Sequence, residues 1–215
     1  MDEQQLKAWF QGIRDMLEPA YLSAVEPWQQ SGFSGPEDRW KALRKPIADC
    51  VDKSGTFLDI GCANGYFLEC LMRWTDERGL QVEPFGLDLS DKIAALARIR
   101  LSKYARNIYV GNCWGWSPPK RFDYVRTELL YVPQGLERLY MSRLLHDFLL
   151  PAGKLLVTGY IPRRQRPELT DPRVSQQDRV PETLTNLGFP VQKVVWGVDA
   201  SGHKGTVVAV IPAFV

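Results

Sequence analysis

Histidine is scarce in this chain, and the other residues that commonly bind metals do not cluster. The sequence contains two His, at positions 146 and 203. It contains four Cys without a CxxC pair, namely Cys50, Cys62, Cys70 and Cys113. A zinc site needs closely spaced Cys and His ligands, so we expect no metal. Unpaired thiols are typical of a reducing compartment, and we expect a cytoplasmic protein.

Long apolar runs and a one-sided charge are also lacking. No stretch approaches the roughly 18 consecutive apolar residues of a membrane-spanning helix, and the acidic, amphipathic N-terminus is unlike a signal peptide. The 27 basic and 25 acidic residues leave a net charge of +2. This charge is too small to require a nucleic-acid partner. We therefore expect no membrane partner, and a monomer or homodimer.

The hydrophobic pattern divides the chain at about residue 50. Residues 1–50 read as a helical lid or cap, whose first helix we expect to end at Pro19. Residues 51–215 alternate short apolar strands with amphipathic helices, including a helix over 136–149, and end in a hairpin. A stretch without periodicity, 161–177, is expected to be a loop. This order predicts a single α/β domain with a mostly parallel, doubly wound sheet.

The strongest local signal is the segment FLDIGCANGYF, which follows the first strand of the α/β region. Asp59 closes the strand, and the small residues Gly61, Ala63 and Gly65 follow at intervals of two, with Cys62 between them. Small residues allow a ligand to approach the backbone closely, and the next helix offers free N–H groups. The alternative is an ordinary glycine-rich turn between a strand and a helix.

A second acidic residue ends the next strand. Asp88 lies 23 positions beyond Gly65, in the segment GLDLS, and a carboxylate there can accept both hydroxyls of a ribose. Asp88 could instead cap the following helix, although Ser90 competes for that role. We favour ribose binding, with Leu89 against the base.

The third strand is followed by GNCW. Asn112 could recognise the edge of an adenine, with Cys113 beside it, and the ring could lie between Leu89 and Trp114. The alternative is a turn followed by two buried tryptophans, Trp114 and Trp116.

These three segments, in this order, resemble the class I S-adenosylmethionine-dependent methyltransferases. LDIGCANG matches the acidic and glycine-rich loop of that family, with Ala63 for the middle glycine, and GLDLS matches its ribose-binding strand end. FDYV and LPAGKLLV, the latter with Ala152 for a glycine, resemble two later elements. The resemblance covers about residues 55–215. It implies a Rossmann-like sheet of order 3-2-1-4-5-7-6 with an antiparallel hairpin strand, S-adenosylmethionine as cofactor, and in-line methyl transfer.

Candidates for the chemistry follow the fourth strand, in VRTELLYVP. Glu128 is the best candidate for a general base and Tyr131 the next. Glu128 could instead hold the cofactor or pair with Arg126. Because the segment lacks the Asn/Asp-Pro-Pro-aromatic element of base-amine methyltransferases, chemistry on a flipped base is disfavoured.

Two segments could bind the acceptor. In residues 1–50, Trp28, Phe33 and Arg39 are our candidates, while Trp40 can equally be core and Arg39 or Arg44 could meet the carboxylate of the cofactor. In the 162–178 loop, Arg163 is the candidate, and together with Arg164 and Arg166 it could bind an anionic substrate or RNA phosphates. This short run of charges could equally be a solvated surface.

Three functions remain open at this point. A methyltransferase acting on a small molecule, at oxygen, nitrogen or sulfur, fits the single domain and modest charge best. An RNA methyltransferase would use the Arg163–Arg166 cluster for phosphates. A non-catalytic scaffold that binds the cofactor is the third.

Overall fold

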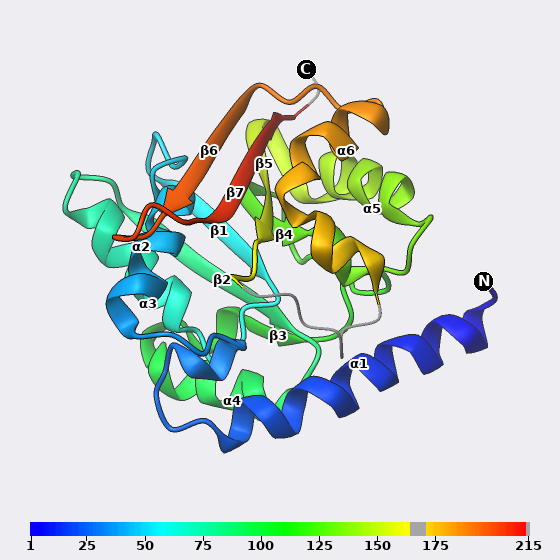
Figure 1. The fold of residues 1–215 in the computed structure, drawn as a ribbon, viewed down its shortest axis with the longest axis horizontal. Coiled ribbons are helices and arrows are strands. Elements are labelled where there is room, and N and C mark those ends of the chain that lie inside the picture. The colour runs from blue at the N-terminus through cyan, green and yellow to red at the C-terminus, as the bar shows by residue number, and fades with distance from the viewer. Residues whose placement is uncertain (164–170, 214–215) are drawn as a thin grey trace.

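The computed structural model describes residues 1–163 and 171–213, which form a central sheet covered by helices on both faces (Figure 1). The sheet has seven strands in the order β3-β2-β1-β4-β5-β7-β6. The strands are β1 (Gly55–Ile60), β2 (Val82–Asp88), β3 (Ile108–Val110), β4 (Phe122–Glu128), β5 (Leu149–Tyr160), β6 (Lys193–Val198) and β7 (Lys204–Pro212). All neighbouring pairs are parallel except those of β7, which runs antiparallel to β5 and to β6. The predicted fold class and strand order are confirmed.

Five of the six α-helices in the described residues fall into two groups according to the face of the sheet that they cover (Figure 1). One group packs on the side of Phe57 and Leu156, and the other on the side of Leu58 and Leu155. The α-helices are α1 (Glu3–Ser23), α2 (Glu37–Ala48), α3 (Tyr66–Asp76), α4 (Asp91–Arg100), α5 (Glu137–Arg143) and α6 (Val180–Asn186). α2, α3 and α4 cover the first side, and α5 and α6 the second. Adjacent strand residues serve opposite cores because side chains alternate along a strand.

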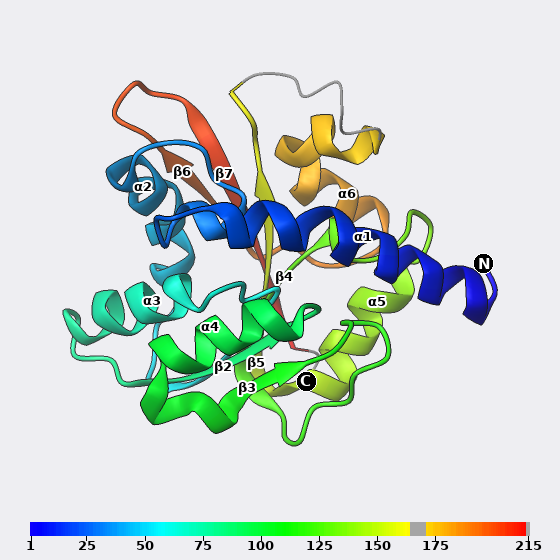
Figure 2. The same cartoon turned by 90° about the horizontal axis from the view of Figure 1, so that it is seen from below.

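α1 belongs to neither layer. It crosses the carboxyl ends of the strands (Figure 2) and begins with a capping box between Asp2 and Gln5. On the apolar face of α1, Phe10 is buried in the core, and Leu6 and Trp9 pack against that core. The helix therefore covers the edge of the sheet at which a ligand would bind.

Two expectations about element boundaries are wrong, and a third differs by one residue at each end. α1 does not end at Pro19 but continues to Ser23, because proline removes only one N–H from a helix that packing stabilises. The helix expected over 136–149 is α5 followed by a π-helical turn, Leu144–Phe148. The loop expected over 161–177 contains a 3-10 helix, Pro172–Arg179, started by the Asp171 side chain. Arg164 and Arg166 lie outside the described residues.

The two alanines that replace family glycines keep a glycine-like backbone. Ala63 has φ +46° and Ala152 has φ +61°. A side chain in this left-handed region costs roughly 1–2 kcal/mol. The chain therefore retains the loop geometry of the motif at the expense of local strain.

We expect Ala152→Gly to stabilise the protein by about 0.5–1 kcal/mol, because glycine removes this strain at an exposed position in the irregular start of β5. Chemical denaturation measures the change. Ala20→Gly, in exposed helical backbone of α1, is the matched control and should destabilise by a similar amount. Destabilisation by both variants would contradict the strain at Ala152.

Candidate functional site

The loop after β1 is shaped by its small residues. Gly61 and Gly65 have φ of +74° and +76°. A Cβ atom at Gly61 would lie 2.5 Å from the Tyr131 hydroxyl oxygen, so any side chain there would collide with Tyr131. Asn64 is buried, and its amide donates to Pro27 O (3.0 Å) and Gln30 Oε1 (2.7 Å). These bonds tie the loop to the segment between α1 and α2.

Asp88 ends β2 directly beside this loop. Its carboxylate accepts from the backbone N–H of Ala63 and of Ser90, both at 2.9 Å. The helix cap belongs to Ser90, whose hydroxyl oxygen accepts from Ile93 N–H at 3.2 Å. Burial raises the pKa of Asp88 to about 6, against the lowering effect of these N–H donors. Asp88 is therefore a half-buried carboxylate that joins the end of β2 to the loop after β1.

A cavity of about 550 Å³ lies between α1 and the carboxyl ends of the strands. Most of the predicted cofactor residues line it, and so do both predicted catalytic residues. The lining includes Asp59, Gly61, Cys62, Ala63, Asp88, Leu89, Asn112, Cys113, Glu128 and Tyr131. Gly65 and Trp114 do not line it; Gly65 packs on Ala97 and Leu101 of the α4 segment, and Trp114 on the core.

The amide of Asn112 is already engaged in its own turn. Its Oδ1 accepts from Gly115 N–H at 2.6 Å. Arg143 holds the same turn by donating to the carbonyls of Cys113, Trp114 and Trp116 at 2.6–3.1 Å. The turn is therefore rigid, and Asn112 offers a ligand mainly its amide N–H groups.

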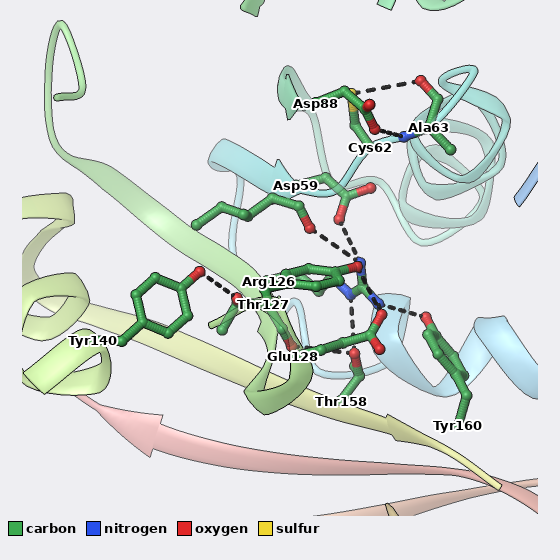
Figure 3. A network of polar contacts seen from close by, with 12 residues as sticks. Asp59, Cys62, Ala63, Asp88, Arg126, Thr127, Glu128, Tyr140, Thr158 and Tyr160 are labelled. Atoms are coloured by element: carbon green, nitrogen blue, oxygen red, sulfur yellow. Dashed lines mark hydrogen bonds and ion pairs between the residues drawn. The ribbon is translucent and has the colours of Figure 1, made fainter. Parts of the chain in front are cut away.

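The floor of the cavity carries a buried guanidinium that the sequence analysis considered only as a partner for Glu128. Arg126 is 4% exposed and reaches carboxylates on both sides (Figure 3). It pairs with Asp59 on the adjacent strand at 3.2 Å and with Glu128. It also donates to the hydroxyls of Tyr131 (3.0 Å) and Tyr160 (2.9 Å). Arg126 thus organises the strand ends of β1, β4 and β5.

Burial and charge set the protonation of this cluster. Burial raises the pKa of Asp59 to about 7, against the lowering effect of Arg126. Burial also raises the pKa of Tyr131 well above its ordinary value. Tyr131 therefore stays a phenol, and its hydroxyl donates to Glu128 Oε1 at 2.7 Å.

α1 is fastened over the cavity by one carboxylate. Glu18 accepts from the Ser90 hydroxyl at 2.6 Å and pairs with Lys92 at 2.7 Å. Trp9, Phe10 and Tyr21 from the same helix line the cavity. The sequence showed the apolar stripe of this helix, but not that it faces the strand ends.

None of the four residues predicted to bind the acceptor lines this cavity. Trp28 donates its indole N–H to Gly35 O at 3.0 Å, and Phe33 packs against the core near Trp40. Arg39 and Arg163 both pair with Asp199, each at 2.9 Å. Arg163 thus shares one carboxylate with Arg39, and the remainder of its cluster lies beyond the described residues. The cavity instead receives Arg44, Trp40 and Tyr160.

Residues 1–163 and 171–213 offer neither a metal site nor a membrane-spanning helix. They contain no group of three or more His, Cys, Asp or Glu side chains able to hold a metal ion. None of their helices combines the length and apolarity needed to cross a membrane.

The fold and the cavity together define a class: a doubly wound, mostly parallel sheet with an antiparallel last strand and a cavity at the carboxyl ends of β1, β2 and β4. No protein-family model matches the sequence, and no curated protein matches it. Comparison with solved structures identifies the fold. The chain has the fold of class I S-adenosylmethionine-dependent methyltransferases.

Three of these structures illustrate the likeness. The 1,6-didemethyltoxoflavin-N1-methyltransferase of Burkholderia thailandensis has a TM-score of 0.64 at 15% identity, over 98% of this chain and 91% of that one. A SAM-dependent methyltransferase of Aquifex aeolicus has a TM-score of 0.60 at 15% identity, over 88% and 100%. The magnesium protoporphyrin IX methyltransferase of Synechocystis PCC 6803 has a TM-score of 0.57 at 15% identity, over 94% and 96%. At such identities the likeness concerns the fold.

Proposed function

We propose that this protein is an S-adenosylmethionine-dependent methyltransferase that acts on a small molecule. The observation that carries the proposal is the convergence of the β1 loop, Asp88 and Glu128 on one roofed cavity. The Burkholderia and Synechocystis neighbours are named for small-molecule substrates, and the latter was crystallised with the cofactor bound.

The residues present fit that cofactor. Each oxygen of Asp88 accepts one N–H bond and keeps a lone pair for a ribose hydroxyl. A volume of about 550 Å³ falls within the roughly 300–1,000 Å³ of ordinary ligand sites. Leu89 would pack on the base and Asn112 would meet its edge, while Asp59 would lie near the amino-acid end.

The bound cofactor would supply a methyl group on a sulfonium. The chain would supply alignment and exclusion of water. α1 would close the cavity with Trp9 and Phe10, as the lid role proposed for residues 1–50 requires. Glu128 would accept a hydrogen bond from the nucleophile of the acceptor, and Tyr131 would hold Glu128 in place through its hydroxyl.

An RNA acceptor has less support than a small molecule. Arg163, the one member of the predicted phosphate-binding cluster that is described, is paired with Asp199. A scaffold function predicts no methyl transfer, and a single-turnover assay with labelled cofactor and a metabolite extract separates it from the enzyme.

Asp88→Ala is the direct test of cofactor binding. We expect affinity for S-adenosylhomocysteine to fall at least about tenfold, because one charge-assisted hydrogen bond contributes about 1.5–3 kcal/mol. Isothermal titration calorimetry measures this. Asp91→Ala, at an exposed carboxylate on α4, is the control and should bind as the wild type does. Unchanged affinity in Asp88→Ala would refute the assignment.

The pH profile of the same titration provides a second readout. With a pKa of about 6, Asp88 is ionised at pH 8 and gains a proton as the pH falls through 6. Protonation removes part of its acceptor capacity, so wild-type affinity should weaken from pH 8 to pH 5. In Asp88→Asn the step near pH 6 should be missing, and any change of affinity near pH 7 that persists belongs to Asp59, whose pKa is raised to about 7.

A further inference from the structure

Arg44 on α2 is a buried cation without an anionic partner. Only 7% of its surface is exposed, and it is one of two arginines in the described residues that are buried beyond nine-tenths. The other, Arg126, pairs with Asp59 and Glu128. Among the residues that the structure describes, Arg44 has neither a hydrogen bond nor an ion pair.

Arg44 contacts aromatic rings instead. The guanidinium carbon lies 3.7 Å from the centroid of the Tyr160 ring, 5.5 Å from that of Trp40 and 5.8 Å from that of Phe33. Aromatic faces attract a cation, but they leave its five N–H donors unsatisfied. Arg44, Tyr160 and Trp40 all line the cavity, so these donors are available to a ligand there.

Burying this charge is unfavourable for the protein alone. A desolvated cation destabilises the fold unless an anion compensates it, and burial lowers the pKa of Arg44 for the same reason. A ligand with a negative charge would supply the compensation. A planar guanidinium fork matches the two oxygens of a carboxylate.

The position of Arg44 favours the acceptor over the cofactor as the source of that carboxylate. Tyr160, on which Arg44 stacks, ends β5, whereas the ribose-binding candidate Asp88 ends β2, with β1 and β4 between them. At about 4.8 Å between strands, the two tips are about 14 Å apart. Glu128, the candidate partner of the acceptor nucleophile, ends β4, next to β5.

Building on the proposed function, we propose that Arg44 binds the carboxylate of an aromatic methyl acceptor. The ring would lie among the aromatic walls of the cavity, near Trp40, Tyr131 and Tyr160. The carboxylate would meet the Arg44 fork. Glu128 would face the nucleophile elsewhere on the same molecule.

Benzoate and benzamide are matched probes, since they share the ring and differ in charge. With the protein saturated by S-adenosylhomocysteine, ligand-observed NMR titration should find benzoate bound at least about tenfold more tightly than benzamide. Arg44→Met keeps the length of the side chain and should abolish that preference. Arg44→Lys keeps the positive charge but lacks the planar fork of donors, so it should retain part of the preference for benzoate. Equal binding of the two probes by the wild type would overturn the proposal.

A second comparison separates the two sources of carboxylate. 5′-Methylthioadenosine lacks the amino-acid group of S-adenosylhomocysteine. Arg44→Met should leave the affinity for both compounds unchanged. A tenfold loss for S-adenosylhomocysteine alone would assign Arg44 to the cofactor and overturn the proposal. A wild type that ignores both compounds would refute the proposed function itself.

Stability supplies the third readout, because a ligand-binding role and a packing role predict opposite results. Arg44→Met removes a buried charge that has no partner, so its Tm should equal or exceed that of the wild type. A fall in Tm of several degrees, with the benzoate preference intact, would mean that Arg44 only packs against Tyr160 and would overturn the proposal.

Discussion

Arg126→Met is expected to destabilise the protein by about 3–5 kcal/mol, the usual effect of breaking a buried ion pair from one side. Arg126 is 4% exposed and neutralises two buried carboxylates, Asp59 and Glu128. Methionine fills much of the same volume, so lost charge rather than a cavity dominates. Urea denaturation at pH 8 measures the effect.

The control for this variant is Arg138→Met, the same change at an exposed arginine of α5. It should shift the free energy of unfolding by less than about 0.5 kcal/mol. The double variant Arg126→Met/Asp59→Asn should be more stable than the sum of its single variants predicts, because the uncompensated charge of Asp59 is removed with its partner. Strict additivity would mean that Asp59 and Arg126 are not coupled.

The pH dependence of the Arg126→Met variant has a definite sign. The pKa of Asp59 in the fold is raised above its ordinary value, to about 7. Such a group destabilises the fold where it is ionised, and protonation relieves it. Loss of Arg126 raises that pKa further, so the variant should recover stability relative to the wild type as the pH falls from 8 to 6.

The same cluster indicates why the sequence located the strand-end residues of the cavity but missed the contacts of Arg126 and the inward side chains of α2 and β5. Asp59, Gly61 and Asp88 are recognisable because each stands at a strand end in a fixed local motif. The pairing of Arg126 with Asp59 depends on β1 lying beside β4 with these two residues in register. Spacing along the chain contains no such information.

α2 illustrates the same limit on one helix. Arg39 and Arg44 are five positions apart, so at about 100° per residue they point in different directions. Arg39 meets Asp199 in the turn between β6 and β7, whereas Arg44 turns into the cavity. The sequence contained both arginines, but only the packing of α2 on the sheet distinguishes them. Tyr160 was missed because the end of β5 was read only as a strand.

Glu128→Gln is expected to lower turnover by at least about 10²-fold while affinity for S-adenosylhomocysteine stays nearly intact. Glutamine preserves the size of the side chain and one acceptor oxygen for the Tyr131 hydroxyl, which lies 2.7 Å from Glu128 Oε1. It removes the negative charge that the nucleophile of the acceptor would meet. Single-turnover transfer of labelled methyl from the cofactor to a metabolite extract measures the chemical step, and calorimetry measures binding.

Tyr131→Phe separates the charge of Glu128 from its orientation. Phenylalanine keeps the ring beside Gly61 but loses the hydroxyl that donates to Glu128. Arg126 still pairs with the carboxylate, so Glu128 keeps one of two fixed partners, and turnover should fall less than in Glu128→Gln. If Glu128→Gln instead loses S-adenosylhomocysteine binding, Glu128 belongs to the cofactor site. If its turnover is unchanged, the methyl acceptor reacts without help from this carboxylate.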